Sequence, residues 1–323
     1  MVKAVRAQKS GGPEVMVYEE IDLAPPGPGQ VQIKHTAIGV NFIDTYMRSG
    51  LYPTPTPFAP GNEAAGTIVA IGAGVTDFKI GDRVTYVIPG GGAYTEARNA
   101  PADRVVKLPD GITDKQAASM MLKGMTAQYL LRRTYKVQKG DTILFHAAAG
   151  GVGLIAGQWA KHLGATVIGT AGSPEKAKLA QANGYAHTIL YRDTDFVAAT
   201  KAIVPEGVPV VYDSVGKDTF LKSLDCLRPL GLLASFGQSS GAVEPLNTGL
   251  LAAKGSLFLT RPTLFTYIAK KEDLVATANE LFDVVSKGIV KIETSAEYAL
   301  KDAVRCHTDL EGRKTTGSVI LVP

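Results

Sequence analysis

The stretch Thr142–Gly153 (TILFHAAAGGVG) limits the fold of this chain more than any other segment. An apolar run typical of a strand ends in a cluster of small residues, and Val152–Leu163 follows at once with helical apolar spacing. This order is typical of a strand–turn–helix unit that holds the pyrophosphate of a dinucleotide at the helix N-terminus. Gly150 would let the backbone approach the phosphates, and Gly153 would let helix and strand pack closely. The same turn also occurs in parallel sheets without a ligand, so the motif alone does not decide between the two interpretations.

The segments after this turn alternate between strands and helices. Apolar runs typical of buried strands occur at Ala165–Thr170, His187–Leu190, Pro209–Asp213 and Leu230–Phe236, and a helix is predicted over Pro174–Asn183. Alternation of this kind predicts an α/β fold with a doubly wound parallel sheet. A glycine turn in such a sheet favours a dinucleotide site over a turn without a ligand.

Residues 1–122 have a different pattern, with short alternating runs separated by glycine and proline turns. This pattern predicts a mostly antiparallel β domain. The runs are Val31–Ala37, Ala65–Ile71, Arg83–Ile88 and Val105–Leu108.

Helical patterns return near the C-terminus. Glu272–Lys287 and Leu300–Leu310 are apolar-periodic and each is closed by a glycine, and Gly317–Val322 has the pattern of a strand. We expect this last strand to return to the first domain. The predicted organisation is a β domain over 1–122, a dinucleotide-binding domain over 123–262 and a C-terminal segment over 263–323.

The composition bears on the class of protein. Hydrophobic residues make up 45% of the chain and charged residues 20%, as is ordinary for a globular protein. No segment has about 18 unbroken apolar residues, and the N-terminus lacks a signal-peptide pattern. The two cysteines, Cys226 and Cys306, cannot form a disulfide framework and have no metal-ligand spacing. We expect a reducing, cytoplasmic location and no membrane association.

Charge is unevenly distributed along the chain. Residues 123–262 carry 15 Lys and Arg and 9 Asp and Glu, a net charge of +6, whereas the remainder carries −2. This excess suits a multiply anionic ligand such as NADPH, although scattered surface lysines would give the same count. No basic run with interleaved aromatic residues occurs, so nucleic acid is not an expected partner.

The residues after the second predicted strand indicate which dinucleotide binds. An acidic residue at this strand end would accept from a ribose hydroxyl and favour NAD. Thr170–Lys176 (TAGSPEK) has no acid there, because Glu175 lies inside the following helix start. Ser173 could donate to a 2′-phosphate and Lys176 could supply charge, with Tyr191 beside them. A solvated helix position is the alternative for Lys176, but the combination favours NADP.

Six motifs occur along the chain: GVNFIDTY (39–46), RSGLYP (48–53), GNEAAG (61–66), FHAAAGGVG (145–153), VYDSVG (211–216) and SFGQSSG (235–241). With these motifs, the chain closely resembles the zeta-crystallin-like quinone oxidoreductases of bacterial type, within the medium-chain dehydrogenase/reductase superfamily. The resemblance covers essentially the whole chain. It implies a GroES-like catalytic domain, a Rossmann domain, NADPH-dependent reduction of quinones and a homodimer. Dimers in this superfamily commonly join Rossmann edge strands, for which Ser256–Thr260 is the candidate.

Zinc alcohol dehydrogenases of the superfamily use a Cys and a Gly-His-Glu segment as catalytic ligands. In this chain Asn41 aligns with the Cys, and Asn62 replaces the His before Glu63. No cysteine occurs in the first 225 residues, and an amide is a poor zinc ligand beside imidazole or thiolate. The sequence therefore predicts a site without metal.

The resemblance also implies four residues near the nicotinamide: Asn41, Asp44, Tyr46 and Tyr52. Without a Lewis acid, quinones and activated enones are suitable hydride acceptors, because they need mainly positioning and a hydrogen bond to the developing oxyanion. We expect Asn41 to hold the cofactor or the substrate carbonyl and one of the two tyrosines to donate to the quinone oxygen. Packing against the proline loop is the alternative for each tyrosine, and Asp44 could simply orient its neighbours.

Further cofactor contacts follow from the same resemblance. Most lie at the ends of predicted strands, where ligands of parallel sheets bind. Solvent-facing charge is the alternative for the two arginines. The predicted positions are Asn41, Thr126, Gly150, Gly151, Val152, Gly172, Ser173, Lys176, Tyr191, Ser214, Phe236, Ser239, Ser240, Arg261 and Arg313.

Other functions have weaker support in the sequence. Gly237–Gly241 (GQSSG) matches the nucleophile elbow of hydrolases, but Ala242–Asn247 contains a proline and has no helical periodicity. His146 is expected to be a hydrogen-bonded buried histidine rather than a base. Two functions stay open as alternatives: reduction of enals, enones or enoyl thioesters, and NADPH binding without catalysis, as in a crystallin-like or RNA-binding protein.

Overall fold

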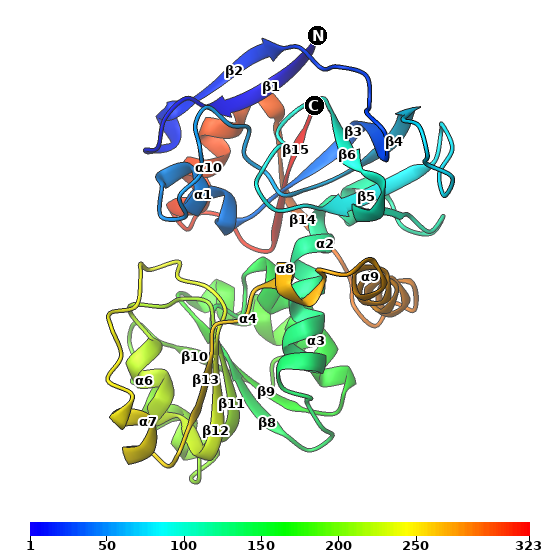
Figure 1. Cartoon of the computed structure of the whole chain (residues 1–323). Helices are drawn as coiled ribbons and strands as arrows, with labels where there is room; N and C mark the ends of the chain where they lie inside the picture. Colours follow the sequence, from blue (N-terminus) through cyan, green and yellow to red (C-terminus); the bar gives the residue numbers. More distant parts are fainter. The chain divides into compact units, whose positions relative to one another are not determined.

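The computed structural model describes residues Met1 to Pro323, and the chain divides into two compact units. Unit 1 comprises Met1–Lys123, Ile268–Ser286 and Ile292–Pro323, and unit 2 comprises Gly124–Tyr267 and Lys287–Lys291. Both chain termini belong to unit 1 (Figure 1).

Unit 2 is built on six parallel strands in the order β10-β9-β8-β11-β12-β13. Counted from β8, this order is 3-2-1-4-5-6, that of the Rossmann fold, and it reverses between β8 and β11. The doubly wound parallel sheet predicted from the sequence is confirmed. The strands are β8 (Thr142–Phe145), β9 (Thr166–Ala171), β10 (His187–Leu190), β11 (Val208–Asp213), β12 (Leu227–Ser235) and β13 (Phe258–Thr260).

Helices cover both faces of this sheet, with α3 and α6 on opposite sides (Figure 1). Phe196 of α5 and Phe220 of α6 pack with the strand residues Leu144 and Val211 in one buried cluster. The helices are α3 (Gly151–His162), α4 (Pro174–Ala182), α5 (Phe196–Ile203), α6 (Phe220–Asp225), α7 (Gly249–Ala253), α8 (Leu264–Tyr267) and the π-helix η3 (Leu130–Thr134).

Unit 1 contains a mainly antiparallel sheet in the order β14-β15-β3-β4-β5-β7, and β6 also pairs with β3. Only β14 and β15 are parallel neighbours. A separate hairpin joins β1 and β2. The strands are β1 (Val2–Ala7), β2 (Met16–Ile21), β3 (Gln30–Val40), β4 (Glu63–Ile71), β5 (Arg83–Val87), β6 (Ala97–Pro101), β7 (Val105–Lys107), β14 (Thr294–Ala299) and β15 (Ser318–Val322).

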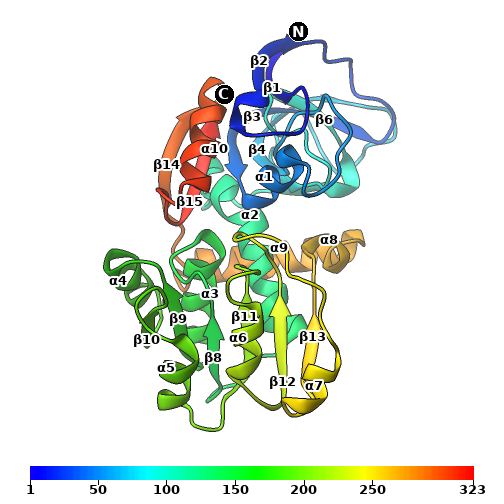
Figure 2. The ribbon, with the colours of Figure 1, turned by 90° about the vertical axis from the view of Figure 1, so that its left-hand side faces the viewer.

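The last strand of the chain, β15, lies between β3 and β14 and pairs with both. Figure 2 shows β14, β15 and α10 side by side within unit 1. No helix of the structure combines the length and the apolar character needed to cross a membrane. The helices and short helical turns are α1 (Phe42–Ser49), α2 (Asp114–Tyr129), α9 (Lys271–Ser286), α10 (Ala303–Glu311), η1 (Pro13–Val15), η2 (Ala102–Arg104) and η4 (Leu300–Asp302).

Candidate active site

Asn41 lies at the junction between β3 and α1. Its backbone is extended, with φ −136° and ψ 155°, and its carbonyl accepts from the Asp44 N–H at 3.0 Å. Asn41 and Asp44 form a capping box at this helix start. Gly50 closes α1 in the left-handed conformation with φ 83°, which glycine adopts at little cost. The helix is therefore fixed at both ends.

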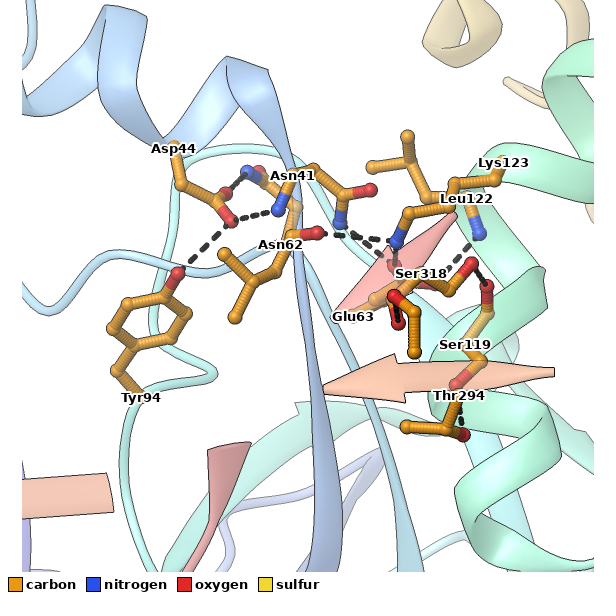
Figure 3. Close-up of polar contacts among 12 residues, drawn as sticks. Asn41, Asp44, Asn62, Glu63, Tyr94, Ser119, Leu122, Lys123, Thr294 and Ser318 are labelled. Atoms are coloured by element: carbon orange, nitrogen blue, oxygen red, sulfur yellow. Dashed lines mark hydrogen bonds and ion pairs between the residues drawn. The ribbon is translucent and has the colours of Figure 1, made fainter. Parts of the chain in front are cut away.

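Asp44 is fully buried beneath the start of α1, and its carboxylate accepts three hydrogen bonds (Figure 3). Oδ2 accepts from the Asn41 backbone N–H at 2.9 Å and from the Tyr94 hydroxyl at 3.2 Å. Oδ1 accepts from Asn62 Nδ2 at 2.7 Å. Asp44 thus orients Asn41, Asn62 and Tyr94 together.

Burial raises the pKa of Asp44 to about 7, and the hydrogen bonds from Asn41 and Asn62 only partly oppose this shift. Removing a carboxylate from water disfavours its charged form. Asp44 therefore changes charge near neutral pH, next to the backbone of Asn41.

Glu63, at the start of β4, is also fully buried and is surrounded by donors. Oε1 accepts from Asn41 Nδ2 at 2.7 Å and lies 3.4 Å from Lys123 Nζ. Oε2 accepts from the Leu122 backbone N–H at 2.7 Å. The Lys123 side chain is only 7% exposed, and its Nζ also donates to the Val40 carbonyl at 3.1 Å. The buried charge of Glu63 is thereby compensated on both of its oxygens.

A chain of buried hydrogen bonds leads from Asp44 to α10. Tyr94 donates to Asp44, so His307 Nε2 must donate to the Tyr94 oxygen, 2.9 Å away. His307 Nδ1 then accepts from Arg48 Nη1 at 3.4 Å. Arg48, with a side chain 2% exposed, forms a bidentate pair with Glu311 at 2.6 and 3.0 Å. These hydrogen bonds fix α1 against α10.

These side chains do not suit a zinc ion. Asn41 turns its amide nitrogen to Glu63, and the Glu63 carboxylate is already occupied by Leu122 and Lys123. The Asn62 Oδ1 atom is buried without a hydrogen-bond partner, but an amide oxygen is a weak zinc ligand. No group of three or more His, Cys, Asp or Glu side chains in the chain could hold a metal ion. The donor set therefore does not fit the zinc site of the dehydrogenases.

Tyr46 and Tyr52, the two predicted proton donors, contact each other. Their ring centroids lie 5.4 Å apart in an edge-to-face arrangement, and the Tyr52 N–H donates to the Tyr46 carbonyl at 2.9 Å. Phe42 continues this aromatic group, 6.3 Å from Tyr46. Both tyrosines are half-buried. Tyr46 lies in α1 and Tyr52 lies in the turn after it, so both are near Asn41 in the sequence.

The glycine turn of unit 2 leads directly into α3. Gly150 is the residue before the helix, and no side chain caps the first N–H groups of α3. Those N–H groups are donors without an intrahelical acceptor, and together with the helix dipole they favour a phosphate. A Cβ on Gly153 would lie 2.5 Å from the Ala147 carbonyl, so only glycine permits this packing. The turn therefore fits the pyrophosphate of a dinucleotide.

A buried polar network lies below the turn. His146 contacts Thr170 Oγ1 at 2.9 Å and Ser223 Oγ at 3.0 Å, and Ser223 donates to Asp213 at 3.0 Å. Burial lowers the pKa of His146. His146 is therefore a hydrogen-bonded neutral histidine, as predicted, and it ties together the carboxyl ends of β8, β9 and β11. Its full burial leaves it no access to a substrate.

Four predicted cofactor residues lie close together at the ends of β9 and β10: Gly172, Ser173, Lys176 and Tyr191. Ser173 caps α4 by accepting from the Lys176 N–H at 3.3 Å, and Glu175 lies in the first turn of that helix. A Cβ on Gly172 would lie 3.5 Å from the Tyr191 hydroxyl. The space beside Gly172 is therefore bordered by Tyr191 and by the start of α4.

The remaining predicted residues lie mainly at helix starts and strand ends. Gly151 and Val152 begin α3, Ser214 and Phe236 directly follow β11 and β12, and Arg261 follows β13. Ser239 and Ser240 occupy the irregular segment before α7, so no helix follows as a hydrolase elbow requires. Thr126 is buried in the part of α2 that belongs to unit 2, whereas Arg313 follows α10 in unit 1.

Sequence reasoning did not identify Lys123, Tyr94, His307 and Arg48 as parts of the site. Glu63 appeared there only as the neighbour of Asn62. No local pattern marks these residues, because their partners are distant in sequence: Arg48 and Glu311 are 263 positions apart. An ionisable residue inside an apolar helix, such as Lys123 in α2, was the one available signal.

Comparisons with known proteins agree with this architecture. An alcohol dehydrogenase GroES-like domain matches residues 27–110, and a zinc-binding dehydrogenase domain matches residues 151–282. A quinone oxidoreductase of Pseudomonas aeruginosa is 52% identical, and the match covers 100% of both chains. A 2-haloacrylate reductase of a Burkholderia species is 46% identical, covering 100% of this chain and 99% of that protein.

A solved structure provides the corresponding comparison in three dimensions. The quinone oxidoreductase of Escherichia coli in complex with NADPH is 49% identical, covers 99% of this chain and 100% of its own, and superposes with a TM-score of 0.98. Sequence similarity at this level over the full length, with the same fold, establishes the family. The chain belongs to the quinone oxidoreductases that combine a GroES-like domain with a Rossmann domain.

Proposed function

We propose that this protein is an NADPH-dependent quinone oxidoreductase that works without a metal ion. The observation that carries the proposal is the full-length similarity, at 49% identity and a TM-score of 0.98, to a quinone oxidoreductase that binds NADPH. The uncapped N-terminus of α3 behind the glycine turn supports the cofactor part.

The proposal assigns the phosphates of NADPH to Gly150, Gly151 and Val152, and its 2′-phosphate to Ser173 and Lys176. It assigns the nicotinamide end to Asn41, Tyr46 and Tyr52, with the buried Asp44 orienting Asn41. The bound cofactor supplies a hydride. The protein groups position the reactants and offer a hydrogen bond to the oxygen that gains charge. The other proposed contacts are Thr126, Gly172, Tyr191, Ser214, Phe236, Ser239, Ser240, Arg261 and Arg313.

Metal independence is supported by the donor set. Two amides stand where zinc dehydrogenases have a Cys and a His, and Glu63 is occupied by Lys123. A substrate must then be electron-poor by itself, because no Lewis acid polarises it. Quinones meet this requirement.

Reduction of activated alkenes is the second candidate, favoured by the 46% identity to a 2-haloacrylate reductase. Steady-state oxidation of NADPH with 1,4-benzoquinone, a naphthoquinone, an enone and 2-chloroacrylate separates the candidates. Highest kcat/KM with the quinones supports the proposal, and highest kcat/KM with the alkenes supports the second candidate. NADPH binding with no turnover on any of them would identify a binding protein instead.

The substitution Lys176→Met is expected to weaken NADPH binding about tenfold and to leave NADH binding unchanged, because one charged contact to the 2′-phosphate is lost. Fluorescence titration with both reduced cofactors measures this. Lys178→Met on the exposed side of the same helix is the matched control and should change neither affinity. An equal loss of affinity for NADPH and for NADH in the Lys176 variant would contradict the assignment of Lys176 to the 2′-phosphate.

We also propose a homodimer formed through β13, within the predicted segment Ser256–Thr260. β13 is an edge strand of the unit 2 sheet, and its Phe258 and Leu259 are 59% and 37% exposed. Open strand edges with apolar side chains pair readily with a second strand. Phe258→Lys is expected to convert the dimer to a monomer in light scattering. Ile80→Lys, at a site 66% exposed in unit 1, is the control and should stay dimeric. A wild-type monomer at micromolar concentration would refute the dimer.

A further inference from the structure

Glu63 and Lys123 form a buried ion pair directly behind the Asn41 amide (Figure 3). Glu63 is fully buried, the Lys123 side chain is 7% exposed, and Nζ lies 3.4 Å from Oε1. A buried ion pair is often no more stable than apolar residues of the same volume, because both charges lose their hydration. Stability alone therefore does not explain why this pair is buried. Its contact with Asn41 offers a functional explanation.

The pair dictates which way the Asn41 amide faces. Glu63 beside an ammonium group is an ionised carboxylate, and an ionised carboxylate only accepts hydrogen bonds. The atom 2.7 Å from Oε1 must therefore be the Asn41 nitrogen. The amide cannot flip without placing its own oxygen against the carboxylate.

Glu63 is itself held in place. Its second oxygen accepts from the Leu122 N–H at 2.7 Å, and Lys123 is anchored by the Val40 carbonyl at 3.1 Å. Asn41 Oδ1 consequently points away from Glu63, because Nδ2 faces the Glu63 carboxylate (Figure 3). Asn41 thus presents an acceptor, in a fixed direction, from the start of α1.

We propose that Glu63 and Lys123 are positioning residues that make Asn41 accept a hydrogen bond from its ligand. The ligand group must then be a donor, such as the carboxamide NH₂ or a ribose hydroxyl of the cofactor, and not the quinone oxygen. This inference rests on the proposed function, because it decides which of two groups Asn41 binds, the cofactor or the substrate carbonyl. The residue that donates to the quinone oxygen is then a different one.

A reversal of the hydrogen bond tests the proposal. Asn41→Asp places a second carboxylate against Glu63 and is expected to weaken NADPH binding about 100-fold. Glu63→Gln alone lets the Asn41 amide turn and is expected to weaken binding about tenfold. In the double variant the new amide donates to the new carboxylate, and an acceptor oxygen faces the ligand again. NADPH affinity should then return to within about tenfold of the wild type.

The readouts are the dissociation constant for NADPH by calorimetry, the thermal unfolding midpoint, and kcat and KM with 1,4-benzoquinone. Glu297→Gln, in the exposed pair of Glu297 with Lys115, is the control for this type of substitution and should change none of them. A wild-type protein that fails to bind NADPH refutes the proposed function. A wild-type protein that binds NADPH, with a folded double variant no better than Asn41→Asp alone, refutes the positioning role.

A second comparison decides the case if the double variant does not fold. A purely structural Glu63 gives losses in NADPH affinity that add to those of Asn41→Ala. A Glu63 that acts through Asn41 gives no further loss in the Asn41→Ala background. Additive losses overturn the proposal, and absence of a further loss supports it.

Discussion

The substitution Gly153→Ala is expected to weaken NADPH binding about tenfold or more and to lower the free energy of unfolding by about 1–3 kcal/mol. The new Cβ would lie 2.5 Å from the Ala147 carbonyl and 2.6 Å from the Ala148 carbonyl. Both are backbone atoms that cannot rotate away, so α3 must move from the turn. The N–H groups proposed to bind the phosphates move with it. Calorimetric titration with NADPH and denaturant unfolding measure the two effects.

Gly111→Ala is the matched control, because it adds the same methyl group where no heavy atom lies within 4 Å. NADPH affinity and unfolding free energy should match the wild type there. If Gly153→Ala bound NADPH as tightly as Gly111→Ala, the glycine turn would not be the phosphate site.

Acidification is expected to destabilise the fold through its buried histidines. In the variant His35→Gln, the slope of the unfolding free energy against pH should decrease by about 1.4 kcal/mol per pH unit. Burial lowers the pKa of His35 to about 4 and that of His307 to about 3. The histidines of the unfolded chain take up protons near pH 6.5, whereas the buried ones stay neutral. The free energy of unfolding therefore decreases as the pH is lowered from about 6.5 to 4. His35 Nδ1 donates to the Thr95 carbonyl at 2.7 Å, and its Nε2 faces the Tyr86 hydroxyl at 2.9 Å.

Asp44 acts in the opposite direction. Its pKa is raised to about 7 in the fold, so the folded state holds a proton that the unfolded chain releases above about pH 4. The stability that Asp44 contributes is lost as the pH rises toward 7. In the wild type this loss cancels the gain in stability that one buried histidine gives over the same rise in pH. Urea unfolding at several values between about pH 5 and 6.5 gives the slope. His187→Gln, at an exposed position, is the control. Equal slopes in the His35 and His187 variants would show that buried His35 does not stay neutral.

The parallel sheet could be predicted because its strands are buried on both faces. Runs such as Pro209–Asp213 are buried throughout and apolar up to the final Asp213, and each is bounded by a turn signal that local sequence reveals. The predicted run at His187–Leu190 and the observed β10 have the same bounds. The strand β14 (Thr294–Ala299) was missed, because its residues are alternately half-buried and exposed and few of them are apolar.

The candidate site could be predicted only where a motif marks it. Asn41 and Asp44 lie in one motif at the start of α1, and a resemblance to a family therefore identified both. Lys123 of α2 contacts Glu63, and His307 of α10 contacts Tyr94, and only the paired sheet of unit 1 brings these segments together. Hydrogen bonds between residues more than 200 positions apart leave no pattern in the local sequence.

Turnover by metal-depleted protein tests the account most directly. The protein is treated with a chelator, its zinc content is measured, and NADPH oxidation is followed with 1,4-benzoquinone. We predict less than about one tenth of an equivalent of zinc and an unchanged kcat/KM, because amides replace the strong zinc ligands. Loss of quinone turnover on chelation, with recovery on addition of zinc, would contradict the account.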